Sequence, residues 1–181
     1  MIWIILGVVV LLVVVLVLFY NRLVRLRNRV ENAWAQVDVQ LKRRYDLIPN
    51  LVETVKGYAS HERETFEAVT NARAAAQSAT GPAEQGAAEG LLSAALGRLI
   101  AVAEAYPELQ ADENFRQLQE ELAQTENRIA VSRQVYNDTV LTYNTAIQTV
   151  PGVFFAGPFG FTKRDFFEAE DATREAPRVA F

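Results

Sequence analysis

The sequence predicts an all-α protein with an N-terminal transmembrane helix that continues into an antiparallel up-down bundle of four long helices. Three observations predict this fold. The first 20 residues form an uncharged apolar run, apolar residues then recur every three or four positions, and no stretch of alternating β-branched residues intervenes. Short connections favour antiparallel neighbours, and a Phe/Gly/Pro-rich loop with a short tail follows the bundle.

Residues 1–20 read MIWIILGVVVLLVVVLVLFY and contain neither charge nor proline. Twenty helical residues span about 30 Å, the thickness of a bilayer's hydrocarbon core, and a helix satisfies its own backbone there. A cleaved signal peptide is the alternative, but it needs a basic start and a small-residue cleavage site, and neither is present. We therefore expect an uncleaved transmembrane anchor.

Four arginines follow the anchor: Arg22, Arg25, Arg27 and Arg29. The positive-inside rule predicts a cytoplasmic bundle with the N-terminus outside, although long domains cross membranes regardless of charge, which leaves the reverse topology open. Charges this close to a membrane each contribute about 1 kcal/mol toward anionic lipid. The sequence does not decide between a role in topology alone and a lipid-facing role.

Residues 21–150 form the predicted bundle, with helices over about 21–46, 49–78, 87–106 and 112–149. Pro49 separates the first two, because proline removes a backbone donor and disfavours helical geometry in the residue before it. Residues 80–82 supply the next turn, Pro107 stops the third helix, and Asp112 is the predicted N-cap of the fourth.

The composition limits the function classes. The chain has 181 residues, 18 of them basic and 22 acidic, with a formal net charge of −4. A nucleic-acid binder usually carries a basic footprint, so this balance argues against nucleic acid as a partner. The absence of cysteine and the presence of one histidine exclude disulfides, thiolate metal sites and any site that needs two histidines.

Long, distinctive strings occur in three parts of the chain: RRYDLIPNLVETVKGYASHE (43–62), AYPELQADENFRQLQEELAQTENRIAVSRQVYND (105–138) and VLTYNTAIQTVP (140–151). Together they resemble the LemA family of bacterial membrane-anchored proteins. The resemblance implies one N-terminal transmembrane helix, a helical-bundle domain and a place in the bacterial inner (plasma) membrane. It implies no established catalytic activity, and some members are associated with organising or shaping membranes.

Candidate chemistry is sparse. His61 stands beside Glu62, but adjacent helix residues point in different directions, so a surface or packing role is the simpler interpretation. The acidic stretch after residue 103 lacks the glutamate–x–x–histidine pairs of a di-metal bundle, and no phosphate-binding glycine loop is present. We therefore expect no enzyme activity, no cofactor, no metal site and no small-molecule substrate.

Tyr136–Asn137 and Tyr143–Asn144 repeat at a spacing of seven. This spacing places both tyrosines on one stripe of the helix and both asparagines beside it. We interpret the repeat as a core seam whose polar groups fix helix register, with a ligand site as the alternative.

Residues 151–181 begin with PGVFFAGPFGF, which contains Phe154, Phe155, Phe159 and Phe161. Such a cluster is costly in an aqueous loop, so it must be buried against something. Because an up-down bundle returns to the membrane at residue 150, we expect the loop to enter the lipid interface or to pack on a neighbouring chain. Packing against its own bundle is the alternative. The tail from Asp171 is polar and ends in three residues, 179–181, that can dock on a partner.

The same topology places two charged groups at the distal end of the bundle, away from the membrane. One is basic and the other acidic: Lys42, Arg43 and Arg44, and Glu104, Glu108, Asp112 and Glu113. Opposite charges there can link neighbouring bundles in a salt-sensitive way.

These features predict a non-enzymatic, single-pass membrane protein whose bundle self-associates, as a homo-oligomer, to scaffold or shape the membrane. The alternative is a membrane-tethered adaptor or sensor. It would bind a partner, such as a membrane protease or signalling protein, through the distal acidic end.

Overall fold

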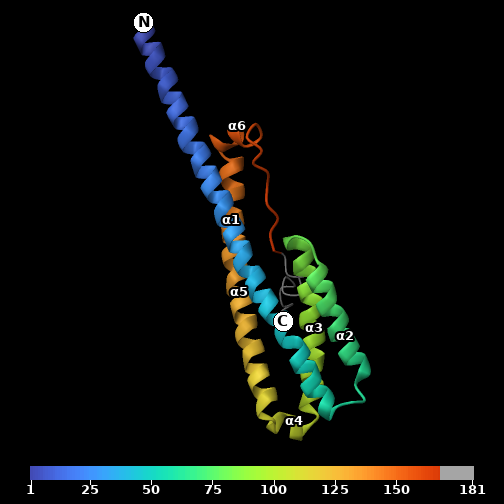
Figure 1. Cartoon of the computed structure of the whole chain (residues 1–181). Coiled ribbons are helices and arrows are strands. Elements are labelled where there is room, and N and C mark those ends of the chain that lie inside the picture. Colours follow the sequence, from blue (N-terminus) through green and yellow to red (C-terminus); the bar gives the residue numbers. More distant parts are fainter. Residues whose placement is uncertain (168–181) are drawn as a thin grey trace, which may run out of the picture.

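The computed structural model describes residues 1–167 (Figure 1). Within them, helices follow one another without any strand, which confirms the all-α class. They are α1 (Ile2–Tyr58), α2 (Arg63–Ser78), α3 (Pro82–Glu104), α4 (Pro107–Ala111), α5 (Glu113–Gln148) and α6 (Gly152–Ala156). The prediction for the tail from Asp171 to Phe181 lies outside the described residues.

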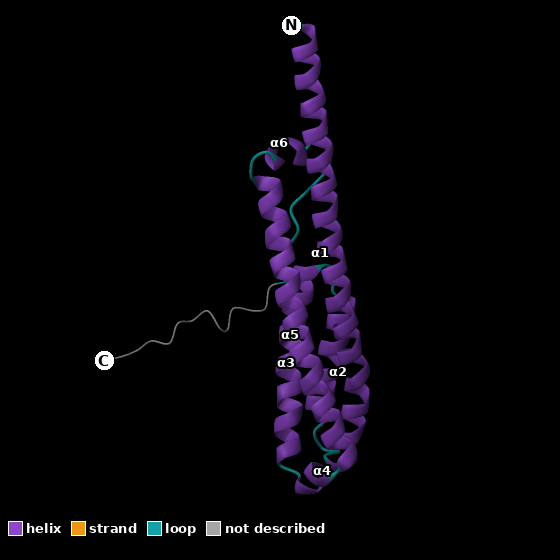
Figure 2. Cartoon of the chain, turned by 90° about the vertical axis from the view of Figure 1, so that its left-hand side faces the viewer, coloured by secondary structure: helices purple, strands orange, loops and turns teal. Residues whose placement is uncertain are grey.

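Helix α1 is both the anchor and the first helix of the bundle. Its apolar N-terminal part has a mean hydropathy of 3.5 and no buried residue, and it projects beyond the other helices (Figure 2). Burial begins at Leu23 and continues on one face at three- and four-residue intervals, as the sequence predicts. Helix α3 is also apolar enough to span a membrane, but 44% of its most apolar window is buried inside the bundle.

Two helix pairs make up the bundle. Helices α1 and α5 run antiparallel along their length, with Trp34 beside Tyr136 at a ring distance of 5.2 Å. Helices α2 and α3 form a shorter hairpin that packs on the lower part of this pair (Figure 1). Helix α4 closes the distal end, and α6 lies beside α1 at the opposite end (Figure 2).

The predicted helix break at Pro49 is wrong, because α1 continues through Pro49 to Tyr58. Proline has no N–H to donate to the carbonyl of Tyr45 four residues earlier. Arg73 of α2 supplies the missing donor instead, since its Nε lies 2.8 Å from the Tyr45 carbonyl oxygen. A side chain from another helix thus satisfies the backbone group that the proline leaves free.

Other helix boundaries also differ from the prediction. The turn between α1 and α2 falls at residues 59–62, and the helix expected from residue 87 already begins at Pro82, a favoured first position for proline. Asp112 is confirmed as the N-cap of α5, because its carboxylate accepts a hydrogen bond of 2.9 Å from the Phe115 N–H. The phenylalanine segment contains the short helix α6.

We predict that Arg73→Met lowers the free energy of unfolding by about 1–3 kcal/mol, because it leaves the Tyr45 carbonyl without a partner. In a Pro49→Ala background the same substitution should cost clearly less, since the N–H of residue 49 then binds that carbonyl. Urea unfolding followed by circular dichroism measures this double-mutant cycle. Strictly additive effects would show that Arg73 does not compensate for the proline.

Candidate functional site

The chain returns to the level of the anchor at the end of α5. There α6 and the turn after it pack against the last residues of the apolar run. The ring of Phe155 lies 6.2 Å from that of Phe19, and Phe159 and Phe161 lie 5.3 and 5.8 Å from Tyr20. Gly152 permits this fold-back, because a Cβ at that position would clash with the Ala146 carbonyl.

The four phenylalanines divide into two groups. Phe161 is buried and Phe155 is half-buried, so these two pack on their own chain, which is the alternative that the sequence left open. Phe154 and Phe159 remain 68% and 43% exposed. With two exposed valines they form a surface that we term the membrane-end platform: Val150, Val153, Phe154 and Phe159. Entry of this platform into lipid remains a prediction.

The basic flank borders the same region. The Arg22 guanidinium lies 5.7 Å from the centre of the Phe19 ring, and Arg27 lies 5.5 Å from that of Phe161. Arg25 and Arg29 are exposed. Cations around an apolar surface suit a membrane interface, where acyl chains and anionic headgroups meet. Lipid contact by these arginines also remains a prediction.

The predicted placement of Lys42, Arg43 and Arg44 at the distal end is wrong. Because α1 does not stop near residue 46, these residues lie about four turns before its end. Lys42 and Arg43 are exposed, but Arg44 is only 3% exposed and points into the bundle.

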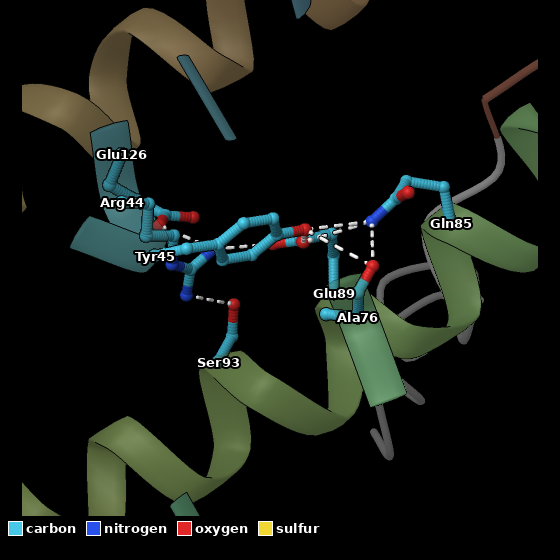
Figure 3. Close-up of polar contacts among 7 residues, drawn as sticks. All are labelled: Arg44, Tyr45, Ala76, Gln85, Glu89, Ser93 and Glu126. Atoms are coloured by element: carbon cyan, nitrogen blue, oxygen red, sulfur yellow. Dashed lines mark hydrogen bonds and ion pairs between the residues drawn. The ribbon is translucent and has the colours of Figure 1, made fainter. Parts of the chain in front are cut away.

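Arg44 is the centre of a buried polar cluster (Figure 3). Its Nη1 lies 3.1 Å from a Glu89 carboxylate oxygen and 3.0 Å from Glu126, and its Nη2 donates to Ser93 at 2.7 Å. The other Glu89 oxygen accepts hydrogen bonds from Tyr45 and Gln85. Gln85 also donates to the last turn of α2, at the carbonyl of Ala76.

This cluster joins α1, α2, α3 and α5 at one point. Burial raises the pKa of the Glu89 carboxyl, although hydrogen bonds from Tyr45 and Gln85 and the charge of Arg44 act in the opposite direction. Burial and the neighbouring carboxylate likewise raise the pKa of Tyr45. Through these contacts the cluster links the α2–α3 hairpin to the α1–α5 pair.

The acidic residues gather at the distal end. Glu104, Glu108 and Glu113 are exposed around α4. Asp112 also accepts a hydrogen bond of 3.0 Å from the hydroxyl of Tyr58, the last residue of α1. The N–H of Phe115 and this hydroxyl lower the pKa of Asp112. Linkage of neighbouring bundles through this end is untested, and its expected basic counterpart lies elsewhere.

His61 is exposed in the turn between α1 and α2. Within residues 1–167, no three His, Asp or Glu side chains come together in a way that could hold a metal ion.

Sequence reasoning missed what the asparagines of the Tyr–Asn repeat bind. Residues 162–167 form an extended segment, here named the strap, which lies along α1 and α5. Asn137 and Asn144 hydrogen-bond its backbone, and the Tyr136 hydroxyl donates to it at 2.8 Å. The seven-residue spacing was the available signal, but nothing in it indicates which chain segment the amides bind. The rings of Tyr136 and Tyr143 lie in the core, as a core seam predicts, whereas the two asparagine side chains bind the strap.

Together, the exposed apolar segment of α1 and the bundle that assembles on the rest of this helix define a membrane-anchored helical-bundle protein. The sequence profile of the LemA family matches residues 33–181. The chain belongs to the LemA family.

The relatives agree with this assignment. Magnetosome proteins MamQ 1 and MamQ 2 of Paramagnetospirillum magneticum are each 28% identical to this chain over an alignment of 190 residues, gaps included. The alignment covers 91% of this chain and 70% of the relative. Protein LemA of Metamycoplasma hominis is 26% identical over 133 residues, which cover 71% of this chain and 59% of the relative.

We predict that Arg44→Met lowers the free energy of unfolding by about 3–5 kcal/mol at about pH 7, because Glu89 loses its buried counter-ion. The loss should shrink at about pH 5, because the raised pKa of Glu89 lets the carboxyl take up a proton and become neutral. Urea unfolding at both pH values measures the effect.

The matched control is Lys42→Met, which removes an exposed cation two residues away and should change stability by no more than about 0.5 kcal/mol. Equal losses for the two variants would contradict the role assigned to Arg44.

Proposed function

We propose that this chain is a non-enzymatic membrane protein whose bundle self-associates to scaffold or shape the membrane. One observation carries the proposal: the exposed apolar side chains of the membrane-end platform lie beside the last residues of the apolar anchor. Val150, Phe154 and Phe159 are 75%, 68% and 43% exposed. Apolar groups that lie in the interface beside an anchor occupy headgroup area, and such insertion is coupled to membrane curvature.

The basic flank supports a cytoplasmic bundle with the N-terminus outside, in a bacterial inner membrane. Arg22 and Arg25 follow the apolar run directly, close enough to attract anionic lipid. The relatives reported above are named for a family or for a cellular structure, not for a reaction. This naming supports a structural role.

We predict that the full-length protein deforms vesicles containing anionic lipid and that Phe154→Ser/Phe159→Ser abolishes the deformation, because polar side chains do not enter the acyl region. Electron cryo-microscopy of reconstituted vesicles measures the change in shape. The matched control, Leu91→Ser/Val131→Ser, alters two apolar residues on α3 and α5 that are 59% and 63% exposed, and it should leave the deformation intact.

Membrane depth provides an independent check of the same prediction. The chain has no cysteine, so Phe154→Cys and Leu91→Cys each create one labelling site. Nitroxides attached to lipid should quench a dye at position 154 and not one at position 91. Equal quenching at both positions would show that the platform does not enter lipid.

Self-association predicts a homomeric particle of several copies in mild detergent, measured by size exclusion with light scattering. A monomer that retains a different protein would instead favour the adaptor hypothesis, in which the exposed acids Glu104, Glu108 and Glu113 bind a partner. This measurement is independent of the platform, because detergent replaces lipid around α1.

A further inference from the structure

The strap is bound through its backbone. The Asn144 side chain donates to the Arg164 carbonyl at 2.8 Å and accepts from the Arg164 N–H at 2.9 Å. The Asn137 side chain likewise donates to the Phe167 carbonyl at 3.2 Å and accepts from the Phe167 N–H at 2.9 Å. Each amide therefore acts as the facing residue of an antiparallel strand does, exchanging both hydrogen bonds with one residue.

The spacing of the two asparagines matches that of an extended chain. Seven residues of helix advance about 10.5 Å. The paired strap residues, Arg164 and Phe167, are three apart, and three extended residues advance about 10 Å. The seven-residue spacing on α5 therefore matches every third residue of the strap, which runs antiparallel to α5.

One side chain adds specificity to this backbone recognition. Phe167 is 1% exposed, lies 6.0 Å from the Trp34 ring, and is covered by the Arg133 guanidinium at 4.7 Å. The other strap residues, 162–166, are exposed, and Arg164 adds one surface ion pair with Glu31 at 3.2 Å. The α1–α5 surface is therefore a site for an extended peptide that carries one aromatic anchor.

The connection that precedes the strap is long enough to reach another molecule. Gly160 has a φ of +72°, which suits glycine and turns the chain from α6 back along the bundle. Residues 157–163 can span up to about 23 Å when extended, and packed helices lie about 8–10 Å apart. Anchors hold neighbouring copies in one plane, so the strap of one copy and the site of the next lie at the same height.

We infer that the α1–α5 site also takes the strap of a second copy, so that exchange of straps links neighbouring bundles in the membrane. This inference rests on the proposed self-association and names its contact. In the second copy the exchanged strap makes the same hydrogen bonds that it makes at home, as in domain swapping. Full extension of the connection costs the contacts of Phe161 with Tyr20 and Arg27. Confinement to a membrane raises the effective concentration of the second strap.

A cross-linking experiment with two differently tagged full-length copies tests the exchange. Leu141 on α5 and Phe166 on the strap line one cavity of about 590 Å³ and are 57% and 37% exposed, so cysteine is tolerated at both. One copy carries Leu141→Cys and the other Phe166→Cys in an otherwise cysteine-free chain. A short thiol cross-linker should join the two copies in reconstituted vesicles.

The control is asymmetric. Asn137→Ala/Asn144→Ala in the copy with Leu141→Cys should abolish the cross-link, because the α1–α5 site of that copy can then no longer bind a strap. The same pair in the copy with Phe166→Cys should leave the cross-link in place. Alanine keeps the helix intact, and circular dichroism verifies folding of both variants.

Two outcomes overturn the inference. One is a cross-link that both placements of the alanine pair weaken equally. The other is co-purification of the two copies without any cross-link between positions 141 and 166, while the double variant Leu141→Cys/Phe166→Cys closes within one chain. If the two copies do not co-purify at all, the proposed self-association itself fails.

Discussion

The continuity of α1 is the constraint on which the rest of the structure depends. One helix from Ile2 to Tyr58 supplies both the apolar segment that needs lipid and the buried face on which the bundle assembles. Because no hinge separates the two parts within this helix, the height of every other element above the bilayer is set by its position along α1. The membrane-end platform and the distal acids are therefore opposite ends of one rigid object.

Polar groups decide how the remaining helices attach to that object. Apolar packing between α3 and its neighbours has little directional preference, since α3 is apolar over much of its surface. The cluster around Arg44 and Glu89 links them by specific contacts, because its members come from four helices and meet at one point. Asn137 and Asn144 do the same for the strap, with amides in place of charges.

Much of the fold follows from local sequence. The apolar run, the periodicity from Leu23 onward and the N-cap at Asp112 are properties of neighbouring residues, and the structure agrees with each of them. Pro49 could not be judged locally, because Arg73, which compensates for it, lies 28 residues after Tyr45, the residue whose carbonyl the proline leaves free. The misplacement of Arg44 follows from that error. The strap could not be predicted, because its backbone is bound by the side chains of Asn137 and Asn144 on α5. No local sequence pattern distinguishes these asparagines from polar groups buried in a core.

A helix without a hinge also has a mechanical consequence. The part of α1 beyond Tyr20 rises about 57 Å from the bilayer at 1.5 Å per residue. Such a lever arm amplifies changes at its base, so that a tilt of the anchor by about 10° carries its far end sideways by about 10 Å. A change in bilayer thickness, which transmembrane helices meet by tilting, would thereby reach the far tip of the molecule as a displacement the width of a helix.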